Sequence, residues 1–406
     1  MAGRSPESPR PSAERKVVAV AGGALQGLEI TYLARKAGHR TILLDRRCDT
    51  PAAGLCHHFV PLELEDHPAL DGALGSVDVI IPATENARAL GSLVEWCETT
   101  GMPLAFDADA YGVSSSKKKS NALFRKLGIP TPSPWPGCPF PLLAKPDLGS
   151  GSEGVQVFPS PDDLRTRFGS SPPTGWVLQE YLEGPSFSVE VVGRPGSYVP
   201  LQVTDLEMDG DYDCKRVVAP SSLSLQLADT LQEMAVTLAR GLGLSGLMDV
   251  EAILHRGTLK ALEMDARFPS QTPMAVYHAT GINMVDLLLD VFLQGDGGPA
   301  PVPAGRKGAS ILEHVRVRSG RLSVCGEGLM ARAGPLHLEA GFFGAHEAVT
   351  SYAPGHEEWV ATLIFRGADL QEAQEQREEV ILEIRRRLKL EGYEDPCPGS
   401  VLEGVE

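Results

Sequence analysis

Residues 248–272 read MDVEAILHRGTLKALEMDARFPSQT. Two runs rich in apolar residues, MDVEAIL and TLKALEMDAR, flank the turn sequence His255-Arg256-Gly257. Strand-length runs separated by a short turn that contains glycine are typical of a β-hairpin. The segment therefore predicts two antiparallel strands that lie side by side.

Three carboxylates of this hairpin are predicted to share one face. Glu263 and Asp265 lie two residues apart on the second strand, and pairing brings Glu251 opposite them. Converging carboxylates repel one another and need a cation. An all-oxygen set near Arg267 suits Mg²⁺ shared with phosphate better than zinc or copper. The alternative is a solvated acidic strand, but the flanking residues are too apolar for a surface ribbon.

The composition is that of an ordinary globular chain of two or three domains. It has 406 residues, 42% hydrophobic and 22% charged, and a formal net charge of −16. This charge argues against nucleic acid or an anionic membrane as a partner, and no apolar run is long enough to span a membrane. The N-terminal stretch lacks the apolar core of a secretory signal. Seven scattered cysteines without a CxxC pair predict reduced thiols and a cytoplasmic location.

The chain divides into five predicted parts. Residues 1–15 form a disordered tail, and 16–112 alternate short apolar strands (16–21, 41–45, 77–84, 103–107) with helix-length segments, which predicts a parallel α/β domain. Residues 113–300 contain closely spaced strands (141–146, 154–158, 176–182, 186–192) and end in a linker at 295–305. Residues 301–395 form an α+β region with one long helix, and 396–406 an acidic tail.

A glycine turn follows the first strand. GGALQG, residues 22–27, resembles a dinucleotide fingerprint without being GxGxxG, and Asp45 ends the next strand, where an acidic residue often holds a ribose. The same turn suits the carboxylate of an amino acid or serves only as a tight connection.

Two lysines are candidates for phosphate binding. Lys145 precedes the glycine-rich loop LGSGSEG, residues 148–154, and Lys117 starts a helix that Ser115 or Ser116 caps. The alternatives are a snorkelling lysine at 145 and solvated lysines at 117–119. The strand WVLQEYL offers backbone groups at residues 179–182 to an adenine, and Ser188 and Glu190 alternate on one strand face.

These features follow one another in a fixed order: a lysine, a second lysine with a glycine loop, a hinge strand and an acidic hairpin. This order resembles the ATP-grasp superfamily over about residues 114–295. The strings GLMDVEAI and LEMDARFPSQ match the metal-ligand strands of that superfamily closely. The resemblance implies a Rossmann-like parallel-sheet domain, an ATP-grasp fold of two sheets clasping ATP, and a C-terminal α+β part. Asp265 stands where many members carry asparagine, and Ser186 where a second acidic residue is common.

Several segments further resemble the ligases of pyrrolysine biosynthesis. They are GGALQGLE, PATEN, SSKKKS, YDCK and EMDARFPSQTPMAVYHATGIN. That resemblance implies that ATP and Mg²⁺ serve to join the carboxylate of 3-methyl-D-ornithine, or D-ornithine, to the ε-amine of L-lysine through an acyl phosphate. The expected partners are these small molecules, and a homodimer is compatible with them. Ala24 stands where relatives carry lysine, which puts a nucleotide role of the first domain in doubt.

The resemblance also implies residue roles. For ATP these are Lys117, Lys145, Val177, Leu178, Gln179, Glu180 and Asp45; for Mg²⁺ they are Glu251, Glu263 and Asp265. For the ornithine they are Ser188, Val189, Glu190, Arg267, Phe268, Pro269, Ser270, Gln271 and Thr272, and for lysine Leu25, Gln26, Glu85 and Glu327. Arg267 is the expected catalytic residue, and Lys215 is expected within reach of the γ-phosphate.

Two other functions remain open at this point. One is a different ATP-grasp ligase for amino acids or dipeptides. The other is a nucleotide-binding regulator or NAD-dependent dehydrogenase built on GGALQG, which leaves the acidic hairpin and the second lysine-bearing region without a purpose.

Overall fold

A computed structural model describes residues 15–149, 153–169, 174–294 and 308–399. The predicted linker, nearly all of the N-terminal tail, most of the acidic tail and the middle of the glycine-rich loop lie outside these ranges.

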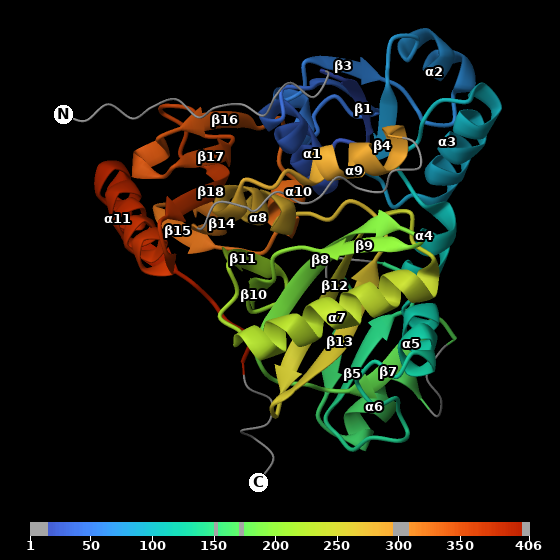
Figure 1. Cartoon of the computed structure of the whole chain (residues 1–406). Coiled ribbons are helices and arrows are strands. Elements are labelled where there is room, and N and C mark those ends of the chain that lie inside the picture. Colours follow the sequence, from blue (N-terminus) through green and yellow to red (C-terminus); the bar gives the residue numbers. More distant parts are fainter. Residues whose placement is uncertain (1–14, 150–152, 170–173, 295–307, 400–406) are drawn as a thin grey trace.

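The N-terminal region is a four-stranded parallel sheet in the order β3-β2-β1-β4, with helices packed on it (Figure 1). Residues 18–21 are completely buried, as expected for a strand covered on both faces. The parallel sheet confirms the prediction for this region. Its elements are β1 Val17–Ala21, α1 Leu25–Lys36, β2 Arg40–Asp45, β3 His58–Pro61, α2 His67–Ala73, β4 Val79–Pro82 and α3 Ala87–Thr100.

Two details of this sheet differ from the prediction. Residues 103–107 do not form a strand, because only Leu104 makes a bridge, to Ile80. β3 was not predicted, because its short sequence HFVP begins with an exposed histidine and ends with an exposed proline and lacks an apolar run.

A small antiparallel sheet, in the order β6-β5-β7, follows in the chain and lies at the opposite end of the molecule (Figure 1). Ser116 caps α5, with its side chain accepting the backbone N–H of Lys119, which confirms the predicted helix start. The elements are α4 Ala108–Ser114, α5 Lys117–Lys126, β5 Leu142–Pro146, β6 Gln156–Phe158, α6 Pro161–Phe168 and β7 Trp176–Glu180.

Twelve strands of the described residues form one large sheet, whose main path is β13-β12-β8-β10-β11-β14-β18-β17-β16. The C-terminal strands therefore continue the sheet that contains the hairpin. The strands are β8 Ser186–Arg194, β9 Ser197–Pro200, β10 Thr204–Met208, β11 Cys214–Ala219, β12 Gly246–His255, β13 Thr258–Asp265, β14 Ala309–Arg318, β15 Arg321–Val324, β16 His337–Ala340, β17 Glu347–Thr350, β18 Trp359–Gly367 and β19 Gly392–Glu394.

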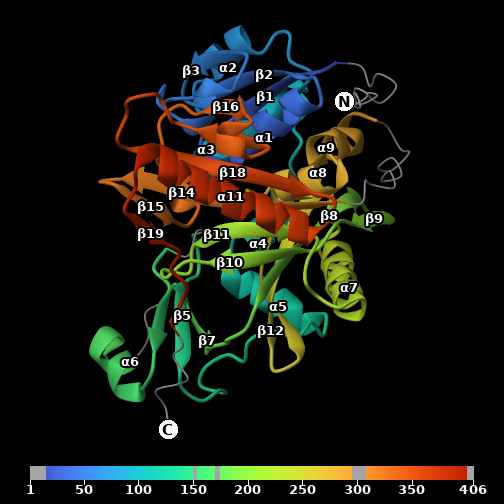
Figure 2. The ribbon, with the colours of Figure 1, turned by 90° about the vertical axis from the view of Figure 1, so that its left-hand side faces the viewer.

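Helices pack on the N-terminal strands and on the C-terminal strands of this sheet. α7 packs on the hairpin side, and α11 lies across β14 and β18 (Figure 2). The helices are α7 Leu225–Leu242, α8 Thr272–Thr280, α9 Met284–Leu293, α10 Gly328–Ala331 and α11 Leu370–Leu388. No single helix of the described ranges is long and apolar enough to cross a membrane; α8 and α9 pass such a test only as a pair bent by 103°.

The predicted hairpin is present as β12 and β13, and its register fixes which side chains share a face. Glu251 lies opposite Glu263, and Asp249 opposite Asp265. On the other side of β12, Ser188 of β8 lies opposite Glu251. The intervening apolar residues pack in a core with α7, which leaves the polar residues on the opposite face.

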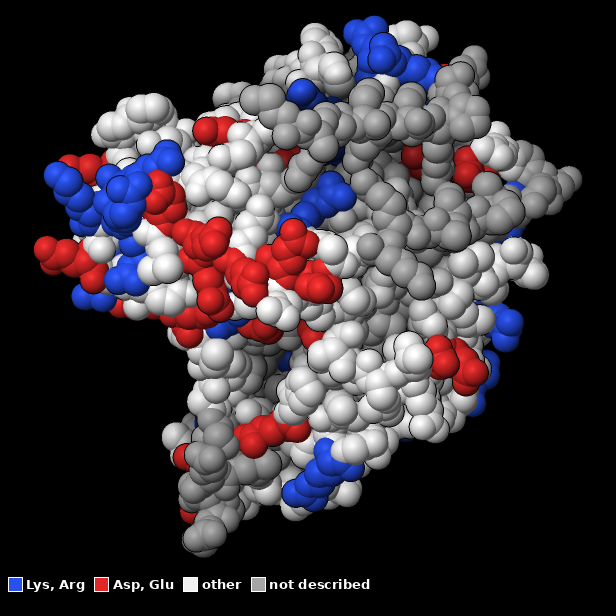
Figure 3. Space-filling model, turned by 60° about the vertical axis from the view of Figure 1, so that its left-hand side comes forward, with Lys and Arg blue, Asp and Glu red and all other residues white. Residues whose placement is uncertain are grey.

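Acidic side chains form a long run across the face shown in Figure 3, in line with the net charge of −16. All seven cysteines, which lie within the described ranges, are free thiols.

Candidate active site

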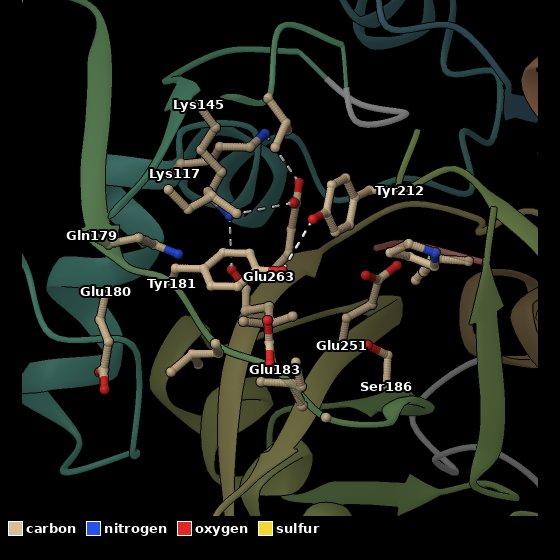
Figure 4. A pocket seen from close by; sticks show the side chains of 18 of the residues that line it. Lys117, Lys145, Gln179, Glu180, Tyr181, Glu183, Ser186, Tyr212, Glu251 and Glu263 are labelled. Atoms are coloured by element: carbon tan, nitrogen blue, oxygen red, sulfur yellow. Dashed lines mark hydrogen bonds and ion pairs between the residues drawn. The ribbon is translucent and has the colours of Figure 1, made fainter. Parts of the chain in front are cut away.

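A cavity of about 430 Å³ separates the small sheet from the hairpin (Figure 4). Its walls come from α5, β5, β7, β12 and β13, which are distant in sequence. Among the residues that line it are Lys117, Lys145, Gln179, Glu180, Glu251 and Glu263. Val177 and Leu178 are buried on the same strand, β7, but do not line the cavity. Four of the residues predicted for ATP are therefore brought together here, whereas Asp45 lies elsewhere.

Two buried lysines surround one carboxylate in this cavity. The Lys117 ammonium donates to the carbonyl of Gly149 at 2.5 Å and to Glu263 Oε1 at 3.2 Å. Lys145 Nζ lies 4.0 Å from Glu263 Oε2, and burial lowers the pKa of Lys145. Both lysines are less than a tenth exposed, which rules out solvated or snorkelling side chains. The two ammonium groups lie on one side of the cavity, where they can contact the oxygens of a phosphate group.

Glu251 and Glu263 face each other across the hairpin, and Asp265 faces Asp249. Burial, and next the charge of Glu263, raise the pKa of Glu251 to about 8. Asp265 Oδ2 forms an ion pair with Arg267 Nε at 2.6 Å, while its other oxygen, Oδ1, is buried without a hydrogen-bond partner. No group of three or more side chains in the described ranges is arranged as a ready metal site. The crowded oxygens nevertheless fit a hard cation such as Mg²⁺.

A second pocket of about 380 Å³ lies between the glycine turn after β1 and the segment before α10. It brings together all four residues predicted for lysine, namely Leu25, Gln26, Glu85 and Glu327, and it also contains Asp213 and Arg267. The structure places Asp45 here too, away from the nucleotide cavity, where Asp45 Oδ2 accepts the backbone N–H of Gly23 at 2.7 Å. The acidic lining favours a cationic ligand.

The loop that follows β13 forms the wall of this second pocket. Arg267 donates to Glu85 at 2.7 Å, and Ser270 and Gln271 donate to Glu327 Oε2 at 2.8 and 2.6 Å. Burial raises the pKa of Glu327. The loop thereby connects the pocket with the end of the acidic hairpin.

A buried polar group lies where the ornithine residues were predicted. Ser188, Glu190 and Thr272 are at most 5% exposed, and the Glu190 carboxylate interacts with the Thr272 side chain. Burial raises the pKa of Glu190 to about 7. Val189 and Phe268 pack in the apolar cores, so only their backbones remain available to a ligand. Pro269 is buried as well.

The structure adds carboxylates that were not predicted. Asp249 precedes Glu251 by two residues on β12, and this spacing in the sequence could have identified it. Glu29 of α1 is 2% exposed and accepts the backbone N–H of Met274 at 2.6 Å. Nothing in the local sequence distinguishes Glu29, because its partner is 245 residues away.

Lys215 does not match its expected place at the γ-phosphate. Its ammonium is almost completely buried and donates to Asp395 Oδ1 and to the carbonyl of Pro396, both at 2.5 Å. The C-terminal segment therefore binds this lysine, and Pro398 and Gly399 of the same segment line the first cavity. The segment runs from β19 past β5 (Figure 2).

We expect the buried acids to make the ligand-free protein less stable at higher pH. Burial raises the pKa of Glu29 to about 8 and that of Glu190 to about 7, both above the ordinary 4.5. The folded state then holds protons that the unfolded chain has lost, so the free energy of unfolding falls between about pH 5 and 8. Each group contributes up to about 1.4 kcal/mol per pH unit. Urea denaturation across this range measures the slope, which Glu190→Gln should reduce; an unchanged slope would contradict the assignment.

The comparisons with known proteins agree with this geometry. Residues 114–271 match the model of the ATP-grasp domain family. The 3-methyl-D-ornithine–L-lysine ligase of Methanosarcina acetivorans is 33% identical over 92% of this chain and 98% of its own length. The ligase of the same name from Methanosarcina mazei is 32% identical over 92% and 97%.

Similar solved structures share the fold at low identity. A biotin carboxylase from Campylobacter jejuni has a TM-score of 0.69 at 16% identity and covers 91% of both chains. An ADP complex of N5-carboxyaminoimidazole ribonucleotide synthetase and an L-amino acid ligase from Bacillus licheniformis each have a TM-score of 0.66, at 15% and 16% identity, and each covers 92% of this chain and 98% of its own. The chain is therefore an ATP-dependent carboxylate–amine ligase of the ATP-grasp superfamily, and it belongs to the family of the 3-methyl-D-ornithine–L-lysine ligases.

Proposed function

We propose that this enzyme joins the carboxylate of 3-methyl-D-ornithine, or of D-ornithine, to the ε-amine of L-lysine in pyrrolysine biosynthesis, with release of ADP and phosphate. The observation that carries the proposal is the pairing of a cavity that contains two buried lysines with a separate acidic pocket, linked by the loop at Arg267. The names of the relatives from Methanosarcina support the same substrates.

In the first step, the ornithine carboxylate attacks the γ-phosphorus of ATP in line, forming an acyl phosphate and ADP. Lys117 and Lys145 offset the charge of the triphosphate, and the backbone of β7 receives the adenine. Glu251, Glu263 and Asp265 would hold Mg²⁺, which when bound supplies further charge neutralisation at the phosphates.

The ornithine itself suits the buried group at Ser188, Glu190 and Thr272. A fully buried carboxylate such as Glu190 is costly unless donors satisfy both of its oxygens. An ammonium group of the ornithine supplies that donor and positive charge. The adjacent backbone of residues 267–272 then lies beside the reacting carboxylate.

In the second step, the ε-amine of lysine attacks the acyl phosphate, and phosphate leaves as the amide forms. The free amine has a pKa of about 10.4, so it must lose a proton before it attacks. Glu85 and Glu327 provide negative charge for the ammonium groups of lysine in the second pocket. Arg267 faces the same pocket and stabilises the developing oxyanion. We expect this chemistry in the cytoplasm, where ATP is available and thiols stay reduced.

The alternative is another ATP-grasp ligase of amino acids, which the fold similarity to an L-amino acid ligase supports. Mass spectrometry of the products from ATP, Mg²⁺, lysine and D-ornithine distinguishes the two. We expect a single amide product whose mass equals that of lysine plus ornithine minus one water. One ADP should form per amide. A panel in which this pair yields no amide while two other amino acids do would favour the alternative.

A further inference from the structure

Gln271, next to the second pocket, has a backbone conformation that non-glycine residues seldom adopt. Its φ is 65° and its ψ is −55°, and the N–H of Thr272 donates to the carbonyl of Ser270 at 2.7 Å. These values describe a γ-turn of the rare, strained kind. Such strain persists only where surrounding contacts hold it, and it concentrates at functional sites.

The side chain of Gln271 is held from two opposite directions. Its amide nitrogen donates to Glu327 Oε2 at 2.6 Å, and its amide oxygen lies 3.0 Å from His314 Nε2. His314, on β14, has its other ring nitrogen, Nδ1, 2.9 Å from Thr362 Oγ1 on β18. The hydrogen bonds therefore form one buried chain from Thr362 through His314 and Gln271 to Glu327.

The donor and acceptor of each hydrogen bond in this series follow from the neutral His314 ring and from the Glu327 carboxylate at its end. Burial lowers the pKa of His314 to about 4, so its ring is neutral at pH 7 and has one N–H donor. When Thr362 donates to Nδ1, the proton stays on Nε2, and Nε2–H donates to the oxygen of Gln271. The amide nitrogen must then face Glu327. The opposite tautomer would turn the amide oxygen toward that carboxylate, which is repulsive.

We propose that Thr362 and His314 are positioning residues for the amine substrate, because they orient the Gln271 amide that holds the Glu327 carboxylate at the second pocket. Neither residue lines that pocket. The inference rests on the proposed function in one respect, namely that the second pocket receives the amine.

The test compares steady-state constants of Thr362→Val and Thr350→Val. Both threonines are at most 1% exposed and lie on the neighbouring strands β18 and β17, but Thr350 donates to the carbonyl of Val360 and not to His314. We expect Thr362→Val to raise the KM for the amine about tenfold, since the hydrogen bond that orients His314, and through it the Gln271 amide, is lost. The KM for ATP and for the ornithine should stay within about twofold of wild type, as should all constants of Thr350→Val.

Variants at His314 supply the rescue experiment. His314→Leu should raise the KM for the amine at least as much as Thr362→Val, and His314→Gln should recover part of the loss, because its amide can donate to Gln271. Equal effects of Thr362→Val and Thr350→Val, or parallel rises of all three KM values, would overturn the positioning role. The comparison uses whichever amine the wild-type enzyme accepts. If the wild type rejects lysine, the proposed substrate is wrong, but the KM values of the variants for the accepted amine still test the positioning role.

Discussion

Replacing Glu251 with glutamine is expected to lower kcat by about 10³-fold, roughly 4 kcal/mol in the activation barrier. Glu251 lies opposite Glu263 and lines the nucleotide cavity, where their mutual repulsion favours a bound cation. Glutamine keeps the shape of the side chain and removes its charge. The substitution therefore weakens Mg²⁺ binding without leaving a cavity.

Three measurements separate this effect from misfolding. The Mg²⁺ concentration at half-maximal rate should rise in Glu251→Gln, and thermal protection by ATP with Mg²⁺ should fall. The ligand-free variant should be at least as stable as wild type, since it no longer buries an ionisable group beside Glu263. Glu233→Gln, on the exposed side of α7, is the control and should behave as wild type. A kcat within tenfold of wild type at unchanged Mg²⁺ dependence would remove Glu251 from the metal site.

The acidic hairpin could be predicted from sequence because it depends on local rules. Alternation predicts that Glu263 and Asp265 share a face of their strand. Glu251 lies opposite Glu263 because a register shift between Glu251 and Ala252 displaces the pairing by one residue, and the sequence did not predict this irregularity. The two buried lysines followed from the same reasoning, since each stands at the boundary of an element whose apolar pattern is clear. Roles of these residues in binding and catalysis stay predictions.

Features that depend on distant contacts could not be predicted. Asp45 ends a strand at the position of a ribose-binding acid, yet the fold directs it to the second pocket through the N–H of Gly23. Lys215 sits on a strand beside the site, but a carboxylate 180 residues later holds it. The hydrogen bonds from Thr362 to Gln271 likewise join two strands, β18 and β14, to the residue that precedes α8, and these segments are far apart in the sequence. Such partners become neighbours only when the sheet assembles.

Replacing Arg267 with methionine is expected to lower kcat by about 10²-fold to 10³-fold, the usual loss when a donor to a developing oxyanion is removed. Arg267 forms an ion pair with Asp265 at 2.6 Å and donates to Glu85 at 2.7 Å, so it is oriented by both the hairpin and the second pocket. Methionine retains the length and the apolar packing of the side chain. Arg267→Lys keeps the charge but not the planar fork, and should recover only part of the rate.

The KM values make this prediction specific to catalysis. Removing Arg267 takes the positive charge away from a pocket that also contains Asp45, Glu85, Asp213 and Glu327. The pocket becomes more negative, so the KM for the cationic lysine should stay the same or fall while kcat falls. A variant in which the KM for lysine rises and kcat is preserved would show that Arg267 binds substrate and does not act on the transition state. Steady-state kinetics with lysine as the varied substrate, at saturating ATP and ornithine, distinguish these outcomes, because a group that acts only in the transition state lowers kcat and leaves ground-state binding intact.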